Sequence, residues 1–129
     1  MKSIVLTLCA FVFAAALSAQ QKADDFVKMN TEVYDFGKIK QGTPVSYYFE
    51  LTNKTEKPIV IENAWSTCGC TVPEYPKSPI AAGATIKLKV QYNAANPGHF
   101  DKDVFIKLAG VEQPKSVKIK GDVEASGKQ

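Results

Sequence analysis

Two cysteines separated by one glycine, Cys68-Gly69-Cys70, are the residues of this 129-residue chain whose type and spacing could do chemistry. Thiols this close together can close a small disulfide ring, bind a thiophilic metal ion, or exchange with other thiols. The third cysteine, Cys9, lies in an apolar segment near the N-terminus. The compartment of the protein and the strands around the pair decide which of these reactions is open to it.

Residues 1–19 have the pattern of a secretory signal peptide: Lys2, an apolar run from Ile4 to Leu17, and a small residue, Ala19, before the expected cut. Cys9 lies inside the apolar run and lacks the small preceding residue that a lipidation cysteine has. Cleavage of 19 residues from 129 leaves 110, the size of one domain, at positions 20–129. We expect a periplasmic or secreted product with no transmembrane segment after cleavage, in an oxidising compartment.

The mature chain has nearly equal numbers of basic and acidic residues, and it contains no arginine. Without Lys2 there are 15 lysines against 13 acidic residues, which gives a formal charge of +2. Nucleic-acid surfaces usually offer arginine for bidentate contacts and gather positive charge on one face. Here the lysines alternate with apolar residues, as in Lys118-Ile119-Lys120, which is typical of a solvated strand face. The sequence therefore predicts no nucleic-acid partner.

Apolar residues alternate with polar residues along most of the mature chain, which is the pattern of half-buried β-strands. Turn signals such as Gln41–Pro44 and Asn96–Gly98 separate these segments. The pattern predicts strands in the following segments: Met29–Asp35, Val45–Leu51, Ile59–Ala64, Ile86–Tyr92, Phe100–Leu108 and Val117–Val123. Strands with one apolar face must pair these faces, so we predict an all-β sandwich of about seven strands, with a barrel as the main rival.

A series of residues spread over the mature chain resembles one bacterial family. The series is Tyr34–Ile39, Gly42, Phe49, Asn53, Pro58, Ile61, Thr67–Pro73, Pro79-Ile80, Gly83, Val90, Tyr92, Gly98, Phe100 and Lys102. From about Val33 to Val123 it resembles the domain of unknown function 1573, frequent among exported proteins of Bacteroidetes. The resemblance implies an immunoglobulin-like β-sandwich akin to major-sperm-protein and Hydin-type domains, and it implies no activity.

The cysteine pair is open to three interpretations. A disulfide closing a three-residue loop stabilises the fold by only about 1.6 kcal/mol, against about 3 kcal/mol for fifteen residues, so it would act as a local clamp. Copper is the alternative cofactor, because two thiolates suit Cu(I), and His99 would join Cys68 and Cys70 if its turn folded beside them. Thiol–disulfide exchange is the third interpretation.

Other side chains give no catalytic set. Asp101 and Asp103 alternate on one strand face, where paired carboxylates are normally solvated rather than catalytic. Tyr48 points away from the face of Tyr47 and Phe49, so Tyr48 and Trp65 are predicted as contact residues, although Trp65 would also suit the core. The sequence thus favours a non-enzymatic, exported interaction or envelope-associated module without a cofactor, and its ligand stays unknown. The alternative is a copper-binding or thiol-redox protein.

Overall fold

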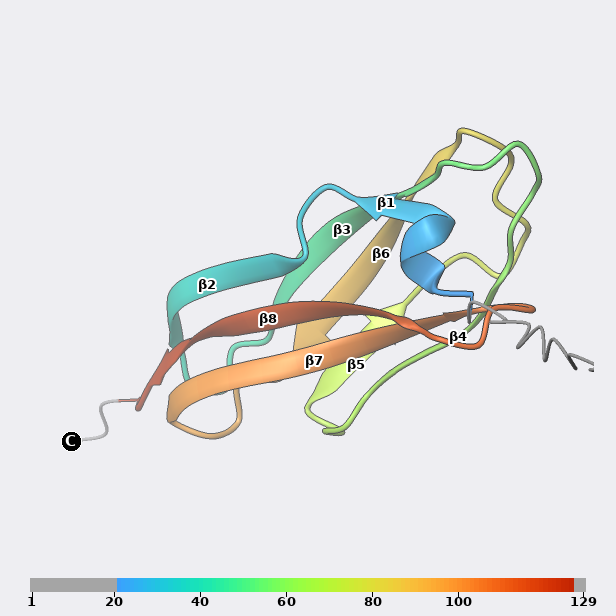
Figure 1. Cartoon of the computed structure of the whole chain (residues 1–129). Helices are drawn as coiled ribbons and strands as arrows, with labels where there is room; N and C mark the ends of the chain where they lie inside the picture. The colour runs from blue at the N-terminus through green and yellow to red at the C-terminus, as the bar shows by residue number, and fades with distance from the viewer. Residues whose placement is uncertain (1–20, 127–129) are drawn as a thin grey trace, which may run out of the picture.

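A computed structural model describes residues 21–126 as two four-stranded β-sheets packed face to face (Figure 1). The predicted signal peptide, with Cys9, lies outside the described residues. The elements in chain order are a 3₁₀ turn η1 (Ala23–Asp25), β1 (Val27–Met29), β2 (Val33–Lys40), β3 (Val45–Asn53), β4 (Ile61–Ser66), β5 (Thr71–Glu74), β6 (Thr85–Tyr92), β7 (Gly98–Leu108) and β8 (Lys115–Glu124). Along this range no helical segment has the length and apolar character that crossing a bilayer requires.

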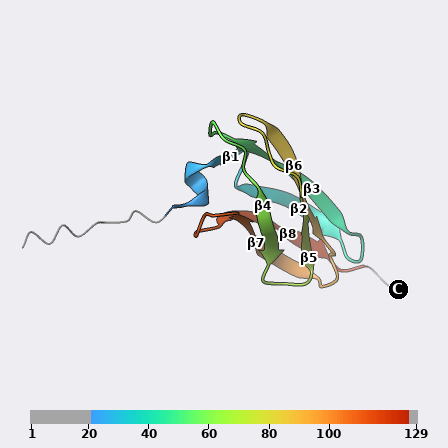
Figure 2. The same ribbon diagram turned by 90° about the vertical axis from the view of Figure 1, so that its right-hand side faces the viewer.

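The strand order confirms the predicted immunoglobulin-like sandwich. One sheet has the order β1-β3-β6-β5 and the other β2-β8-β7-β4. Neighbouring strands are antiparallel except β2, which runs parallel to β8. Both sheets thus contain strands that are distant in sequence, as in immunoglobulin domains. Figure 2 shows the two layers after a turn of 90°.

The structure has eight strands rather than about seven, and the segment Met29–Asp35 belongs to two of them. The strand β1 ends at Met29 and β2 begins at Val33, in the opposite sheet. Asn30 ends the first pairing, because its side-chain oxygen accepts a hydrogen bond from the Glu50 amide at 2.9 Å. Glu32 begins the second pairing, since its carbonyl accepts from the Lys118 amide at 2.7 Å. The chain therefore changes sheets over these few residues.

The strand β5 is the element that periodicity did not predict. Four residues are too few for an alternating pattern to be recognised, and Pro73 argues against a strand unless it lies at a sheet edge. In the structure β5 is such an edge strand, paired with β6 on one side.

The core confirms the predicted apolar faces. Most of the large, completely buried apolar side chains come from the four long inner strands: Phe49 and Leu51 on β3, Leu88 and Val90 on β6, Val104, Ile106 and Leu108 on β7, and Val117 and Ile119 on β8. Aromatic rings from both sheets extend this core toward one end. Tyr34 of β2 stacks on Tyr47 of β3, with ring centroids 3.7 Å apart, so this pair bridges the two sheets.

Hydrogen bonds and ion pairs attach the N-terminal segment before β1 to the sandwich. Ala23 is buried, and its amide donates to the Gln113 carbonyl at 3.0 Å. The ammonium of Lys115, a nearly buried side chain, forms ion pairs with Asp24 and Glu32. Burial lowers the pKa of Lys115, but hydrogen bonds and Coulomb attraction from both carboxylates outweigh it, so the pKa lies above its usual range.

Asn53 is a buried polar side chain that holds the loop after β3. Its amide nitrogen donates to the carbonyls of Lys57 at 2.8 Å and Ile80 at 3.0 Å. Its side-chain oxygen accepts from the Thr55 amide at 2.9 Å and from the Thr55 hydroxyl at 2.7 Å. The Asn53 side chain therefore fixes the conformation of the Asn53–Lys57 turn.

Replacing Asn53 with alanine should lower the free energy of unfolding by roughly 2–3 kcal/mol, because buried carbonyl and amide groups lose their partners. Urea denaturation measures the change. Asn63→Ala is the control, since Asn63 is exposed on β4, and its effect should be below about 0.5 kcal/mol. Equal effects of the two substitutions would contradict the role of Asn53.

The stabilisation from Lys115 should depend on pH in a defined direction. A folded-state pKa raised above 10.5 means that the ion pairs stabilise the fold fully below that pH, and that this stability disappears as pH rises through the raised pKa. Lys115→Met should therefore be less stable than the wild type by about 1 kcal/mol at pH 7. The difference in urea midpoint should shrink only in the alkaline range, and a difference that shrinks between pH 7 and 9 would contradict this.

Candidate functional site

The cysteine pair forms a disulfide in the turn between β4 and β5. The Sγ atoms of Cys68 and Cys70 are bonded, with their Cα atoms 5.2 Å apart. Because β4 and β5 are edge strands of different sheets, this turn carries the chain from one layer to the other. The structure thus realises the predicted local disulfide, at the rim of the sandwich rather than between its sheets.

Backbone hydrogen bonds hold this turn on both sides of the disulfide. The Thr71 amide donates to the Cys68 carbonyl at 3.2 Å, and the Asn93 amide donates to the Cys70 carbonyl at 2.9 Å. The Ser66 hydroxyl donates to the Asp103 carbonyl at 2.7 Å. The turn is therefore tied to β6 and β7 by groups other than sulfur.

The two sulfurs have different surroundings. The Cys70 amide donates to the Cys68 sulfur at 3.1 Å. The Cys70 side chain packs against the core, and its sulfur lies 3.7 Å from the hydroxyl of buried Thr71. Both side chains are half-buried, but the pair is asymmetric in packing against the core and in hydrogen bonding.

His99 does not complete a metal site with the cysteines in the described part of the chain. It lies at the start of β7, where its Nδ1 is 3.1 Å from the Asp122 carboxylate on β8. Among residues 21–126 no three histidine, cysteine, aspartate or glutamate side chains come together in a group that could hold a metal ion. The structure thus places Cys68 with Cys70, and His99 with Asp122.

Asp101 and Asp103 lie on the outer face of β7 beside Lys118 of β8. The Lys118 ammonium is 3.0 Å from the Asp101 carboxylate and 3.9 Å from that of Asp103. The hydrogen bond that Lys118 donates to Asp101 raises the pKa of Lys118, and Coulomb attraction to both carboxylates adds to this effect. These carboxylates therefore take part in a surface ion-pair network, the solvated arrangement that the sequence predicted.

The two predicted contact residues lie on opposite outer faces of the sandwich. Tyr48 is 51% exposed on β3, opposite Lys89 of β6. Trp65 is 36% exposed on β4 of the other sheet, stacked on Phe105 with ring centroids 5.6 Å apart. Each face therefore presents its own aromatic group, and the two do not form one surface.

A groove at one end of the sandwich is the site that sequence reasoning missed. It has a volume of about 530 Å³ and is lined by Phe26, Thr55–Val60 and Ala109. These residues come from the N-terminal segment, the β3–β4 loop and the β7–β8 turn, three segments far apart in sequence. Alternation within strands gives no signal for such a site, because its residues lie outside or at the ends of strands.

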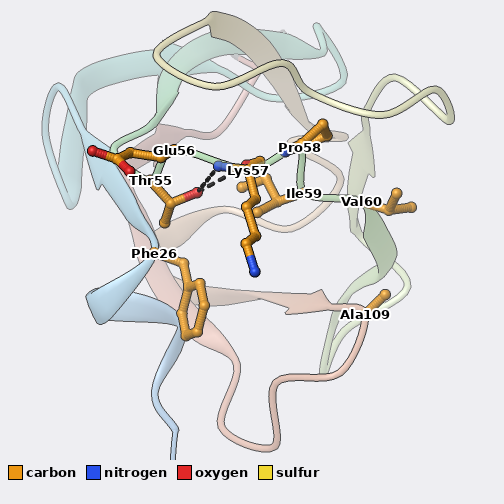
Figure 3. A pocket seen from close by; sticks show the side chains of 8 residues that line it. All are labelled: Phe26, Thr55, Glu56, Lys57, Pro58, Ile59, Val60 and Ala109. Carbon is orange, nitrogen blue, oxygen red and sulfur yellow. Dashed lines mark hydrogen bonds between the residues drawn. The ribbon is translucent and has the colours of Figure 1, made fainter.

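The groove is mainly apolar with one cation. Phe26, Pro58, Ile59, Val60 and Ala109 supply apolar surface. In Figure 3 the Lys57 side chain extends into the space between Phe26 and Ala109, whereas the Glu56 carboxylate points away. The Asn53 hydrogen bonds to the loop hold this lining in place. An open apolar groove of this kind is suited to contact with an apolar segment of a partner.

Comparisons with known proteins extend the structural picture. A model of the family "Protein of unknown function (DUF1573)" matches residues 27–123. The curated proteins contain no significant match to the sequence. Solved structures that resemble the chain share its fold at low sequence identity.

PapD-like domain 7 of human CEP192 has a TM-score of 0.65 and 10% identity, covering 79% of this chain and 87% of that one. A protein of unknown function from Porphyromonas gingivalis W83 has a TM-score of 0.64 and 16% identity over 86% of this chain. The VesB protease of Vibrio cholerae has a TM-score of 0.60 and 17% identity over 78% of this chain. The chain spans 51% of the Porphyromonas protein and 33% of VesB. At these identities the likeness shows the fold alone.

Removal of the disulfide should cost little stability, because it closes a three-residue loop. Cys68→Ser combined with Cys70→Ser should lower the free energy of unfolding by no more than about 2 kcal/mol. Urea denaturation measures the free energy of unfolding of the double variant, of the oxidised wild type and of the reduced wild type. A loss above about 4 kcal/mol, the value for long loops, would show that the disulfide staples the whole sandwich.

Proposed function

The chain belongs to the DUF1573 family of proteins of unknown function, and from that premise we propose that it is an exported module that binds a protein or envelope partner in its end groove without catalysing a reaction there. The observation that carries the proposal is the apolar groove at the end of a rigid sandwich. Immunoglobulin-like domains commonly bind through the loops at their ends, which the sheets hold in fixed positions.

Export is proposed from residues 1–19, which have the charge and apolar pattern of a secretory signal peptide. A disulfide between the remaining two cysteines suits the periplasm or the outside of the cell, where such bonds persist. The partner would therefore be a molecule of that compartment.

Binding through the groove can be separated from binding through other surfaces by two alanines at opposite ends of β7. Ala109 lines the groove just after the strand, and Ala95 lies in the loop before it. Both are exposed, so glutamate at either position should leave the fold intact. A charge at Ala109 would place a carboxylate against the apolar lining, which is unfavourable for an apolar partner.

Immobilised residues 20–129 should retain a partner from an envelope extract. Ala109→Glu should retain at least about tenfold less of this partner, because a charged group would be buried at the interface without a hydrogen-bonding partner. Quantitative mass spectrometry of the retained proteins and lipids measures this. Ala95→Glu is the matched control and should bind like the wild type. If Tyr48→Ser or Trp65→Ser abolished binding while Ala109→Glu did not, an outer sheet face would replace the groove as the binding site.

A further inference from the structure

We propose that Cys68 and Cys70 form a thiol–disulfide exchange site, which oxidises thiols of a partner polypeptide and is attacked at the Cys68 sulfur. The inference rests on the β4–β5 turn alone and is independent of the groove. The site lies at the other end of β4 from the groove, because Val60 precedes this strand and Cys68 follows it.

The hydrogen bonds of the turn preserve its shape when the disulfide opens. The bonds from the Thr71 amide to Cys68 and from the Asn93 amide to Cys70 use backbone carbonyls as acceptors. They do not depend on the oxidation state of sulfur. The two Cα atoms, 5.2 Å apart, therefore stay within the range in which a disulfide closes. A dithiol held in this way can form and break its bond without refolding of the domain.

The surroundings of each sulfur assign the roles. Both cysteines are half-buried, but only Cys70 packs against the core, so the Cys68 sulfur is the one that an incoming thiolate reaches from the solvent side. Cys70 then leaves as a thiolate, 3.7 Å from the Thr71 hydroxyl, which can turn to donate a hydrogen bond to it. In the reduced site the Cys70 amide, 3.1 Å from the Cys68 sulfur, stabilises the Cys68 thiolate.

The space beside Gly69, between the two cysteines, is open. Gly69 is exposed, and a Cβ atom added to it would meet no atom within 4 Å. A polypeptide bearing a cysteine can therefore approach over the glycine without displacing side chains of this chain. A side chain at position 69 would hinder the incoming polypeptide sterically, so the glycine leaves room for it.

The reaction conserves atoms and electrons. A substrate thiolate attacks the Cys68 sulfur, the bond between Cys68 and Cys70 breaks, and a mixed disulfide forms with release of the Cys70 thiolate. A second substrate thiolate then attacks the substrate sulfur of the mixed disulfide, and the Cys68 thiolate leaves. The substrate dithiol becomes a disulfide, both substrate protons pass to water or to the cysteine thiolates, and two electrons reach the protein.

The equilibrium test uses residues 20–129 in their oxidised form with reduced glutathione as the probe. Alkylation of free thiols followed by mass spectrometry should show conversion to the dithiol through a glutathione adduct on Cys68. The reduced protein should return to the disulfide with oxidised glutathione. A pair that stays oxidised in a large excess of reduced glutathione would overturn the exchange activity.

Two single variants test the assignment of roles. Cys70→Ser leaves Cys68 as the free thiol, and Cys68→Ser leaves Cys70. With an aromatic disulfide that releases a coloured thiolate, Cys70→Ser should react at least about tenfold faster than Cys68→Ser, because Cys68 is the more accessible and better stabilised thiolate. Circular dichroism confirms that both variants are folded. Equal or reversed rates would overturn the assignment of Cys68 as the reactive sulfur.

Discussion

The packing of two apolar sheet faces against each other is the interaction on which the other features of this domain depend. Antibody domains reinforce this contact with a disulfide between the sheets. Among residues 21–126 the disulfide lies in a turn at the rim, and packed side chains such as the stacked pair Tyr34 and Tyr47 make the contact between the sheets. Phe100 of β7 stacks on Tyr92 of the other sheet, with ring centroids 4.0 Å apart, and its cross-strand neighbour Gly121 leaves room for this ring, because an added Cβ would lie 2.8 Å from it. Because the core carries the stability, the cysteines are free to lie elsewhere.

The passage of the N-terminal chain between the sheets places the groove at the end of the sandwich. Once β1 has paired with β3, the residues before it must lie along the β7–β8 turn. The ion pairs of Lys115 with Asp24 and Glu32 hold this arrangement on both sides of β1. Phe26 is consequently brought opposite the β3–β4 loop, and a groove forms from three segments that share no local pattern.

The sequence predicted the buried faces of the strands, which depend on alternation of apolar and polar residues. It did not predict contacts between segments that are distant in sequence. The inward faces of β3, β6, β7 and β8 follow from period-two patterning, because burial acts on every second residue. The change of sheets at residues 30–32 could not be predicted, because an alternating pattern does not determine with which strand a segment pairs. The spacing of Cys68 and Cys70 left a disulfide as one of three interpretations, and it did not exclude a metal site or thiol exchange. The partner of His99 was not, because Asp122 meets it only through the register of β7 and β8.

The position of the disulfide changes the physical role that it can have. A bond between sheets joins residues distant in sequence, and it removes much entropy from the unfolded chain. The bond between Cys68 and Cys70 spans one residue, in a turn that Asn93 and Asp103 already hold by hydrogen bonds. Its contribution to folding is small, so its opening leaves the sandwich in place. A cysteine pair at the rim of the sandwich, whose bond the fold does not need, meets the structural condition that the proposed exchange with other thiols and disulfides requires.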